Sequence, residues 1–250
     1  MKSLLLSLAA LATTGCAVYA PTVPSTPLIE AGQAEASAVL RGGTAIELNG
    51  AYSPAAHVLV TVESALRCTP NGQSDSNDSP DNPIDVHRQL GVGLGTYTVF
   101  DEPKRTYLAA VAGMGFAAVD VHHYVLFDGF GYYQARYNRY YGQVYAARQQ
   151  GNTTSGISLR CTWLQYTRLL ENGRPVTTDY ARFYLEPTLF MRIGTGALQG
   201  QGTLGLSLPS NFDRSVYNHA ALSPISGLVS IGLVLRPHLL KPRSEPPVGQ

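Results

Sequence analysis

The chain has 250 residues, with 18 Lys and Arg against 17 Asp and Glu, so its formal net charge is +1. Because the basic residues are also scattered along the chain, there is no electrostatic case for a nucleic-acid partner. Charged residues make up only 14% of the chain, whereas Gly (25) and Tyr (15) are plentiful, which is unlike an average soluble domain.

The chain begins with MKSLLLSLAALATTGCA, a stretch typical of an export signal. Lys2 supplies the positive start, and the apolar run Leu4–Leu11 is too short to span a bilayer as a helix. Cys16 follows a small residue, as in bacterial lipoprotein signals, although Thr13 stands where these usually carry Leu. We therefore expect a signal peptide over 1–15 and lipidation of Cys16. Ordinary signal cleavage nearby is the alternative.

Two Pro-rich segments flank the rest of the chain. Residues 16–31 hold Pro21, Pro24 and Pro27 among Ser and Thr residues, which is typical of an extended tether without packed structure. The prolines of the C-terminal tail, 237–250, argue against a strand there. We expect the folded domain to cover 32–236.

Between these segments, runs that alternate apolar and polar residues recur, broken by turn-rich stretches, and no segment has a helical period. Most runs reach the roughly 9–11 residues that a tilted strand needs to cross a bilayer. The ten runs cover 33–41, 44–52, 57–68, 88–100, 106–121, 138–149, 155–170, 179–193, 197–208 and 226–236.

The connections between these runs alternate in length. The short ones are 53–56, 101–105, 151–155 and 194–196, the long ones are 69–86, 122–137, 171–179 and 209–224, and only 42–43 breaks the pattern. Outer-membrane barrels have short periplasmic turns and long outer loops. The pattern therefore predicts an all-β protein, a closed antiparallel up-and-down transmembrane barrel with all long loops on one side.

The run 179–193 has one charged face and one apolar face, because neighbouring side chains of a strand point to opposite sides. Arg182, Glu186 and Arg192 share one parity, and Phe183 and Leu189 share the other. We expect the apolar face to point outward to acyl chains and the polar face to point inward, together with Arg168 on the preceding run. Glycines at alternate positions, as in GVGLGTY, are predicted to leave room for large neighbouring side chains. Aromatic residues near the strand ends predict an interfacial girdle: Tyr52, Phe100, Trp163, Tyr166 and the tyrosines of 132–145.

The chain resembles the small bacterial outer-membrane β-barrels of the OmpA/OmpX-like class, and more closely uncharacterised barrels of the Bacteroidetes type with a lipoprotein signal. Cys16, the YAPTVPSTPLI tether, the AYSPAAHVLV hairpin and FYLEPTLFMRIG carry the resemblance. It implies this fold and a place in the bacterial outer membrane. Because ten is an even number of strands and the long loops lie on the outer side, both termini are expected to be periplasmic. The resemblance implies no activity, because such barrels serve many functions.

A polar network is predicted inside the barrel. Charges out of water must be paired, so we expect ion pairs that fill a narrow lumen. The alternative is a narrow polar path for small solutes, whose selectivity these charges would tune. The predicted residues are Arg41, Glu47, Glu63, Arg67, Arg160, Arg182, Glu186 and Arg192.

A second candidate site is an aromatic and basic stretch in the connection 122–137 and the run after it. Such residues stack on sugars or contact protein partners. The alternative is an extended hairpin whose tyrosines belong to the girdle. The residues are Tyr132, Tyr133, Arg136, Tyr137, Arg139 and Tyr140.

The sequence gives only weak support for catalytic or metal-binding groups. His122 and His123, with Asp120 and Asp128, suggest a metal site or a general base, but adjacent histidines point to opposite faces of a strand and so make a poor metal site. His219 with Ser215 or Ser223 has no spacing that supports a nucleophile. The acidic residues of 75–85 lack the pattern of a calcium loop. Cys68 and Cys161 lie on outward faces of distant strands, so no disulfide is expected. The sequence thus predicts no catalytic residue, no metal and no cofactor.

We therefore expect a non-enzymatic outer-membrane barrel for envelope structure or surface interaction. Its partners are membrane lipid and, through the outer loops, a glycan or protein, with no nucleic acid. Three alternatives remain open: a narrow pore for small solutes, an outer-leaflet lipid-modifying enzyme, and a soluble periplasmic β-sandwich lipoprotein.

Overall fold

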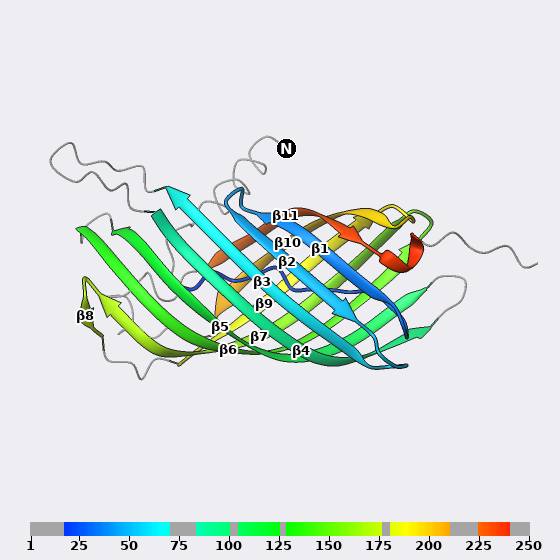
Figure 1. The fold of residues 1–250 in the computed structure, drawn as a ribbon, viewed down its shortest axis with the longest axis horizontal. Helices are drawn as coiled ribbons and strands as arrows, with labels where there is room; N and C mark the ends of the chain where they lie inside the picture. Colours follow the sequence, from blue (N-terminus) through cyan, green and yellow to red (C-terminus); the bar gives the residue numbers. More distant parts are fainter. Residues whose placement is uncertain are drawn as a thin grey trace, which may run out of the picture.

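The computed structural model describes residues 18–70, 84–100, 105–125, 129–176, 181–210 and 225–240. They form a closed antiparallel barrel of ten strands, with a two-residue strand, β8 (Arg174–Pro175), added beside β7 (Figure 1). The barrel strands are β1 (Ala34–Arg41), β2 (Ala45–Tyr52), β3 (Leu59–Pro70), β4 (Ile84–Phe100), β5 (Thr106–Val125), β6 (Gly129–Gln150), β7 (Thr153–Glu171), β9 (Ala181–Ile193), β10 (Leu198–Pro209) and β11 (Ser226–Leu235).

Each barrel strand pairs with its neighbours in sequence, and β1 pairs with β11 to close the sheet. Closure satisfies the hydrogen-bonding groups that an open sheet would leave at its edges. The predicted all-β up-and-down barrel is confirmed. A β-sandwich is excluded because the strands form one continuous sheet and not two stacked ones.

The barrel has two distinct ends. At the turn end, strands are joined by 53–58, 101–105, 151–152 and 194–197, and the 3-10 helix η2 (Pro237–Leu239) follows β11. At the loop end lie the connections 42–44, 71–83, 126–128, 172–180 and 210–225. No helix among the described residues is long and apolar enough to cross a membrane.

One predicted connection is wrong. The residues 122–137 were expected to form a long loop, but β5 continues to Val125 and β6 begins at Gly129, so only 126–128 join them. The two strands pair over this whole stretch, down to Val125 with Gly129. The wall formed by β4–β7 is therefore far taller at the loop end than the wall formed by β1 and β2 (Figure 1).

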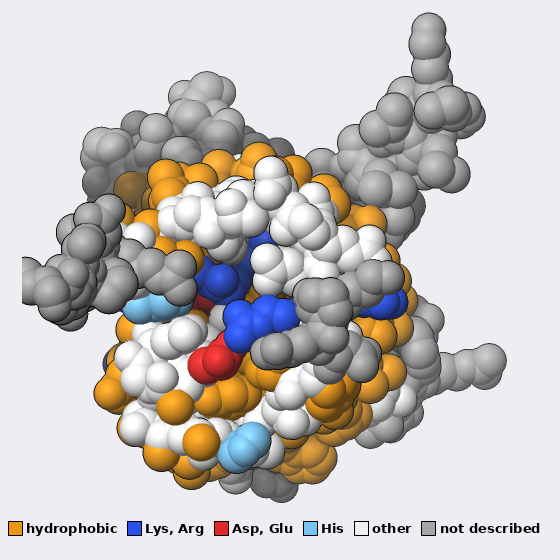
Figure 2. All heavy atoms as spheres, turned by 90° about the vertical axis from the view of Figure 1, so that its right-hand side faces the viewer, with side chains coloured by type: hydrophobic (Ala, Val, Ile, Leu, Met, Phe, Trp, Pro, Cys, Tyr) orange, Lys and Arg blue, Asp and Glu red, His pale blue; other side chains and the backbone are white. Residues whose placement is uncertain are grey.

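The predicted orientation of the two faces is confirmed. Large apolar side chains of every barrel strand are exposed on the outside, including Leu48, Leu94 and Leu189. Polar and charged residues of opposite parity are buried inside, such as Glu63 and Arg192. Seen from the turn end, apolar side chains surround the molecule, and charged side chains gather in the centre (Figure 2).

Inward-facing glycines make room for one large side chain, as expected. A Cβ added at Gly113 would lie 2.3 Å from Cζ of Tyr141, and one at Gly93 would lie 2.8 Å from its Oη. Because Gly93 on β4 and Gly113 on β5 have no side chain, the Tyr141 ring can reach into the lumen from β6.

The aromatic girdle is only partly as predicted. Tyr52, Phe100 and Trp163 are exposed on the outer face. Tyr166 is buried inside the barrel. The remaining tyrosines of 132–145 divide by parity along β6, so that Tyr140 is exposed outside, whereas Tyr133, Tyr137, Tyr141 and Tyr145 are buried inside.

Candidate functional site

The candidate site is the barrel lumen, into which all of the predicted network residues project. Glu47, Glu63, Arg160, Arg182, Glu186 and Arg192 are buried, and Arg41 and Arg67 are half-buried. Arg41 pairs with Glu47 near the loop end, and Arg192 pairs at 2.9 Å with Glu35, a lumen acid that the predicted network did not include.

Glu63 forms the central ion pairs of the lumen. Its carboxylate pairs with Arg139 (Nη2–Oε2, 2.8 Å) and, through its other oxygen, with Arg160. Both guanidinium groups also lie over the ring of Tyr141, 4.9 and 4.5 Å from its centroid. Since both arginines are fully buried, these contacts supply the partners that buried charges require.

The position of Arg139 contradicts the second predicted site. It was placed in an outer interaction surface together with Tyr132, Tyr133, Arg136, Tyr137 and Tyr140. The structure does not bring this set together. Tyr133, Tyr137 and Arg139 are buried in the lumen, whereas Arg136 and Tyr140 are exposed outside and Tyr132 is half-buried. Alternation along β6 causes the division, because these residues belong to a strand and not to a loop.

The lumen is occupied by the N-terminal segment, defined as residues 18–30. Val18 and Tyr19 pack at the loop end against Tyr133, Tyr166 and Leu169, among others. Ile29 packs at the turn end with Leu59, Tyr97 and Tyr107. The dark blue segment therefore threads the barrel from the β8 side to the η2 side before β1 begins (Figure 1).

Wall side chains bind the backbone of the N-terminal segment along its length. Glu47 accepts a hydrogen bond from the N–H of Val23 at 2.8 Å. Arg192 donates to the carbonyl oxygen of Thr26 at 2.7 Å. Further donors to its carbonyl oxygens are Gln143 to Ser25, Tyr145 to Pro27, Arg236 to Leu28 and Tyr107 to Ile29.

Side chains of the segment join the same contacts. The Thr22 hydroxyl oxygen accepts hydrogen bonds from Arg139 (2.6 Å) and Arg160 (3.3 Å). The Tyr19 hydroxyl donates to Glu186 at 2.7 Å, and its ring centroid lies 4.3 Å from that of Tyr184. The central arginines therefore bind both the wall and the segment.

The composition of the segment suits this path. Pro21, Pro24 and Pro27 fall at every third position, the period of a polyproline II helix, and each removes a backbone N–H that would need a partner inside the barrel. The expectation of an unpacked tether over 16–31 is therefore wrong for residues 18–30. A signal for burial was present, because Val18, Tyr19, Val23 and Ile29 are unnecessary in a solvated tether.

The weaker candidates remain apart from the lumen centre. Asp85 accepts hydrogen bonds from the backbone N–H of His122 at 2.8 Å and lies 2.9 Å from its Nδ1. Cys68 and Cys161 are free thiols, as predicted. The described residues hold no cluster of three or more His, Cys, Asp or Glu placed to bind a metal. Outside the described residues lie Cys16, the acidic residues 75–81, Asp128, the side chain of His123, and Ser215, His219 and Ser223.

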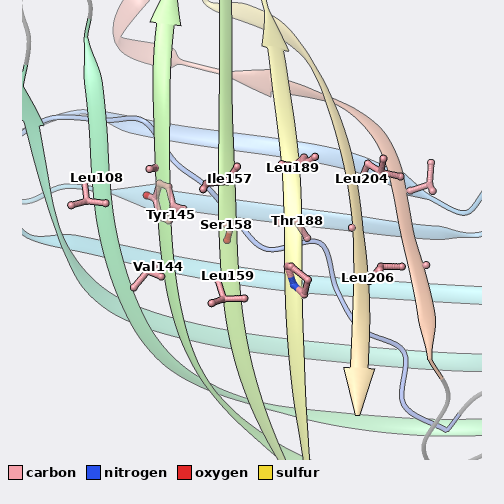
Figure 3. Close-up of a pocket in the computed structure, with 15 residues that line it drawn as sticks. Leu108, Val144, Tyr145, Ile157, Ser158, Leu159, Thr188, Leu189, Leu204 and Leu206 are labelled. Carbon is pink, nitrogen blue, oxygen red and sulfur yellow. The ribbon is translucent and has the colours of Figure 1, made fainter. Parts of the chain in front are cut away.

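A shallow apolar groove of about 810 Å³ crosses the outer wall (Figure 3). Leu108, Leu189 and Leu206 stand around it, and Pro187 and Gly227 contribute the small outward surfaces between them. Its accessible lining is almost entirely apolar, so the groove belongs to the outer wall.

The sequence matches no protein-family model and no curated protein. Inferences about function therefore rest on the barrel itself.

Proposed function

We propose that this protein is a non-enzymatic outer-membrane barrel whose lumen is closed by its own N-terminal segment, and that it serves envelope structure or surface interaction. The occupied lumen is the observation that carries the proposal. The hydrogen bonds from wall to segment use the same charges that would otherwise line a water-filled path.

The exposed apolar side chains of the outer wall support a membrane location. Large aliphatic residues are exposed on all ten strands, for example Ile46, Val92 and Ile231. Burying apolar surface of this extent in acyl chains is favourable by about 25 cal/mol per Å². A closed barrel is also one of the two backbone forms that satisfy all hydrogen bonds within a bilayer.

The first test is membrane insertion. We expect the protein to fractionate with outer membranes and to migrate faster on a gel before boiling than after it, since a folded barrel resists detergent. A protein that stays folded and dissolved without detergent contradicts the proposal.

The second test separates a closed barrel from a pore. The whole protein in a planar bilayer should be electrically silent, whereas a variant lacking residues 18–30 should conduct, because the path through the lumen is then unoccupied. Steady conductance by the whole protein favours the narrow pore instead.

Threading also bears on the location of the N-terminus. Long loops of outer-membrane barrels face the outside, and Val18 lies at the loop end. Cys16 precedes Val18 by no more than about 7–8 Å of chain. We therefore expect a mature chain that starts at Cys16 to begin on the outer side, and η2 and the tail to leave on the inner side. This expectation replaces that of two periplasmic termini.

A further inference from the structure

A row of arginines crosses the outer face of β4–β7 near the loop end. Arg88 pairs in register with Ala118, Ala118 with Arg136, and Arg136 with Arg168. All three arginines are exposed. Because neighbouring strands lie about 4.8 Å apart, three cations stand on one short line across the wall.

A β-bulge completes this row. The register between β6 and β7 shifts at Arg136 and Tyr137, where Thr167 is the extra residue on β7. Simple alternation would have pointed Arg168 inward, as expected from the sequence. The bulge instead turns Arg168 outward and buries Leu169 in the lumen. Bulges commonly redirect a side chain toward a site of use.

The row lies just beyond the apolar wall. Four residue pairs closer to the turn end along β5 and β6, Met114, Tyr140, Trp163 and Phe183 face outward in register. Tyr140 and Trp163 are 40% and 48% exposed. Tyr and Trp are enriched at the headgroup level of membranes. In the proposed bilayer, the arginines therefore lie at or just above that level.

The length of β6 agrees with this placement. Arg136 and Arg148 both point outward near opposite ends of the strand. The stretch between them is about 40 Å long at roughly 3.3 Å per residue. With the usual barrel tilt of about 45°, this corresponds to roughly 28 Å along the barrel axis, close to the thickness of a hydrocarbon layer.

The charge of the three arginines is only partly balanced by the described residues around them. Arg88, Arg136 and Arg168 form no ion pair with any of them. Arg136 and Arg168 stand directly opposite each other, an arrangement of like charges that destabilises a sheet. The exposed acid on this face, Asp120, is diagonal to the row and accepts a hydrogen bond from Tyr132 at 3.3 Å.

We infer that the row formed by Arg88, Arg136 and Arg168 binds phosphate groups of anionic lipid headgroups on the loop side of the barrel. Guanidinium groups match phosphate through paired N–H donors. Each basic side chain near an anionic membrane surface also adds to lipid affinity. The inference rests on the proposed membrane location, and it names the lipid class that this face would hold.

The chain contains an intrinsic fluorescent probe near this row of arginines. Trp163 is its single tryptophan, and it faces outward on β7 on the same side as Arg168. Brominated acyl chains quench tryptophan on contact, so quenching measures which lipid collects at this face. The full-length protein, folded in zwitterionic micelles, is titrated with brominated phosphatidic acid or brominated phosphatidylcholine.

We expect phosphatidic acid to bind about fivefold more tightly than phosphatidylcholine. The triple variant Arg88→Gln, Arg136→Gln, Arg168→Gln should lose this preference. Arg148→Gln is the matched control, since it removes an outward arginine of β6 at the other end of the barrel, and it should keep the preference.

Three results would overturn the inference: no preference in the whole protein, a preference that survives in the triple variant, or release by inorganic phosphate alone, which would indicate a free-phosphate site. Migration before boiling shows whether each variant is folded and inserted. A dissolved protein contradicts the proposed function, whereas an inserted barrel without lipid preference contradicts this inference alone.

Discussion

Arg139 on β6 donates a hydrogen bond of 2.8 Å to Glu63 on β3, although β4 and β5 separate these strands in the wall. The contact is possible because both side chains point into the lumen, where Arg160 meets the same carboxylate. One carboxylate thus compensates two buried guanidinium groups. The stability of the barrel should depend on it.

The first prediction is that Glu63→Gln destabilises the barrel. It leaves two buried cations without their carboxylate, and breaking a buried pair costs about 3–5 kcal/mol. Urea unfolding of the protein folded in detergent measures the loss. The matched control is Glu30→Gln, which removes an exposed pair with Arg105 and should cost less than about 1 kcal/mol. Equal losses in the two variants would contradict the central role of Glu63.

The second prediction concerns the space that glycine leaves for Tyr141. Gly113→Ala places a Cβ against the ring, which cannot move freely because Arg139 and Arg160 lie over it. We expect a loss of about 1–3 kcal/mol in unfolding free energy. Gly142→Ala, with nothing within 4 Å of its Cβ, is the control and should be neutral or slightly stabilising.

A double variant tests the cause. The loss of unfolding free energy caused by Gly113→Ala should be much smaller when it is measured in a protein that already carries Tyr141→Ala, because the clash with the ring is then absent. Additive losses in the double variant would mean that the ring is not what the glycine accommodates.

Much of the fold followed from the sequence, because a barrel strand records its two faces in alternate residues. The outward positions of Leu189 and Leu206 and the inward positions of Glu63 and Arg192 were all predictable from parity. Parity fails where the register shifts. The extra residue Thr167 reverses the faces beyond it, and no local pattern indicates a bulge.

The main features of the site were harder to predict. Arg139 was assigned to a surface because it adjoins the residues 122–137, which were taken for a loop, although it lies in the predicted run 138–149. The path of the N-terminal segment depends on contacts between residues more than a hundred positions apart, such as Thr22 with Arg139. Its prolines indicate an extended chain, but they do not distinguish a solvated tether from one enclosed by a barrel.

The third prediction tests the apolar wall. Leu189→Arg and Leu206→Arg replace exposed side chains within β9 and β10, away from the strand ends. At mid-depth in a bilayer each should cost about 2–4 kcal/mol, and Ile84→Arg, at the loop end of β4, about 0–1 kcal/mol. Unfolding in lipid vesicles measures the differences. Equal, small costs at all three sites would indicate a wall that faces water.

The fourth prediction tests the direction of threading. Because the N-terminal segment runs from Val18 at the loop end to Ile29 at the turn end, an epitope inserted directly before Val18 should bind antibody on intact cells. An epitope placed after Leu240, next to η2 at the turn end, should bind only after the outer membrane is permeabilised. An insertion before Val18 leaves Cys16 and the signal unchanged, so export is not altered. If both epitopes require permeabilisation, the segment does not open to the outside, and either the orientation of the barrel or the path of the segment must be different.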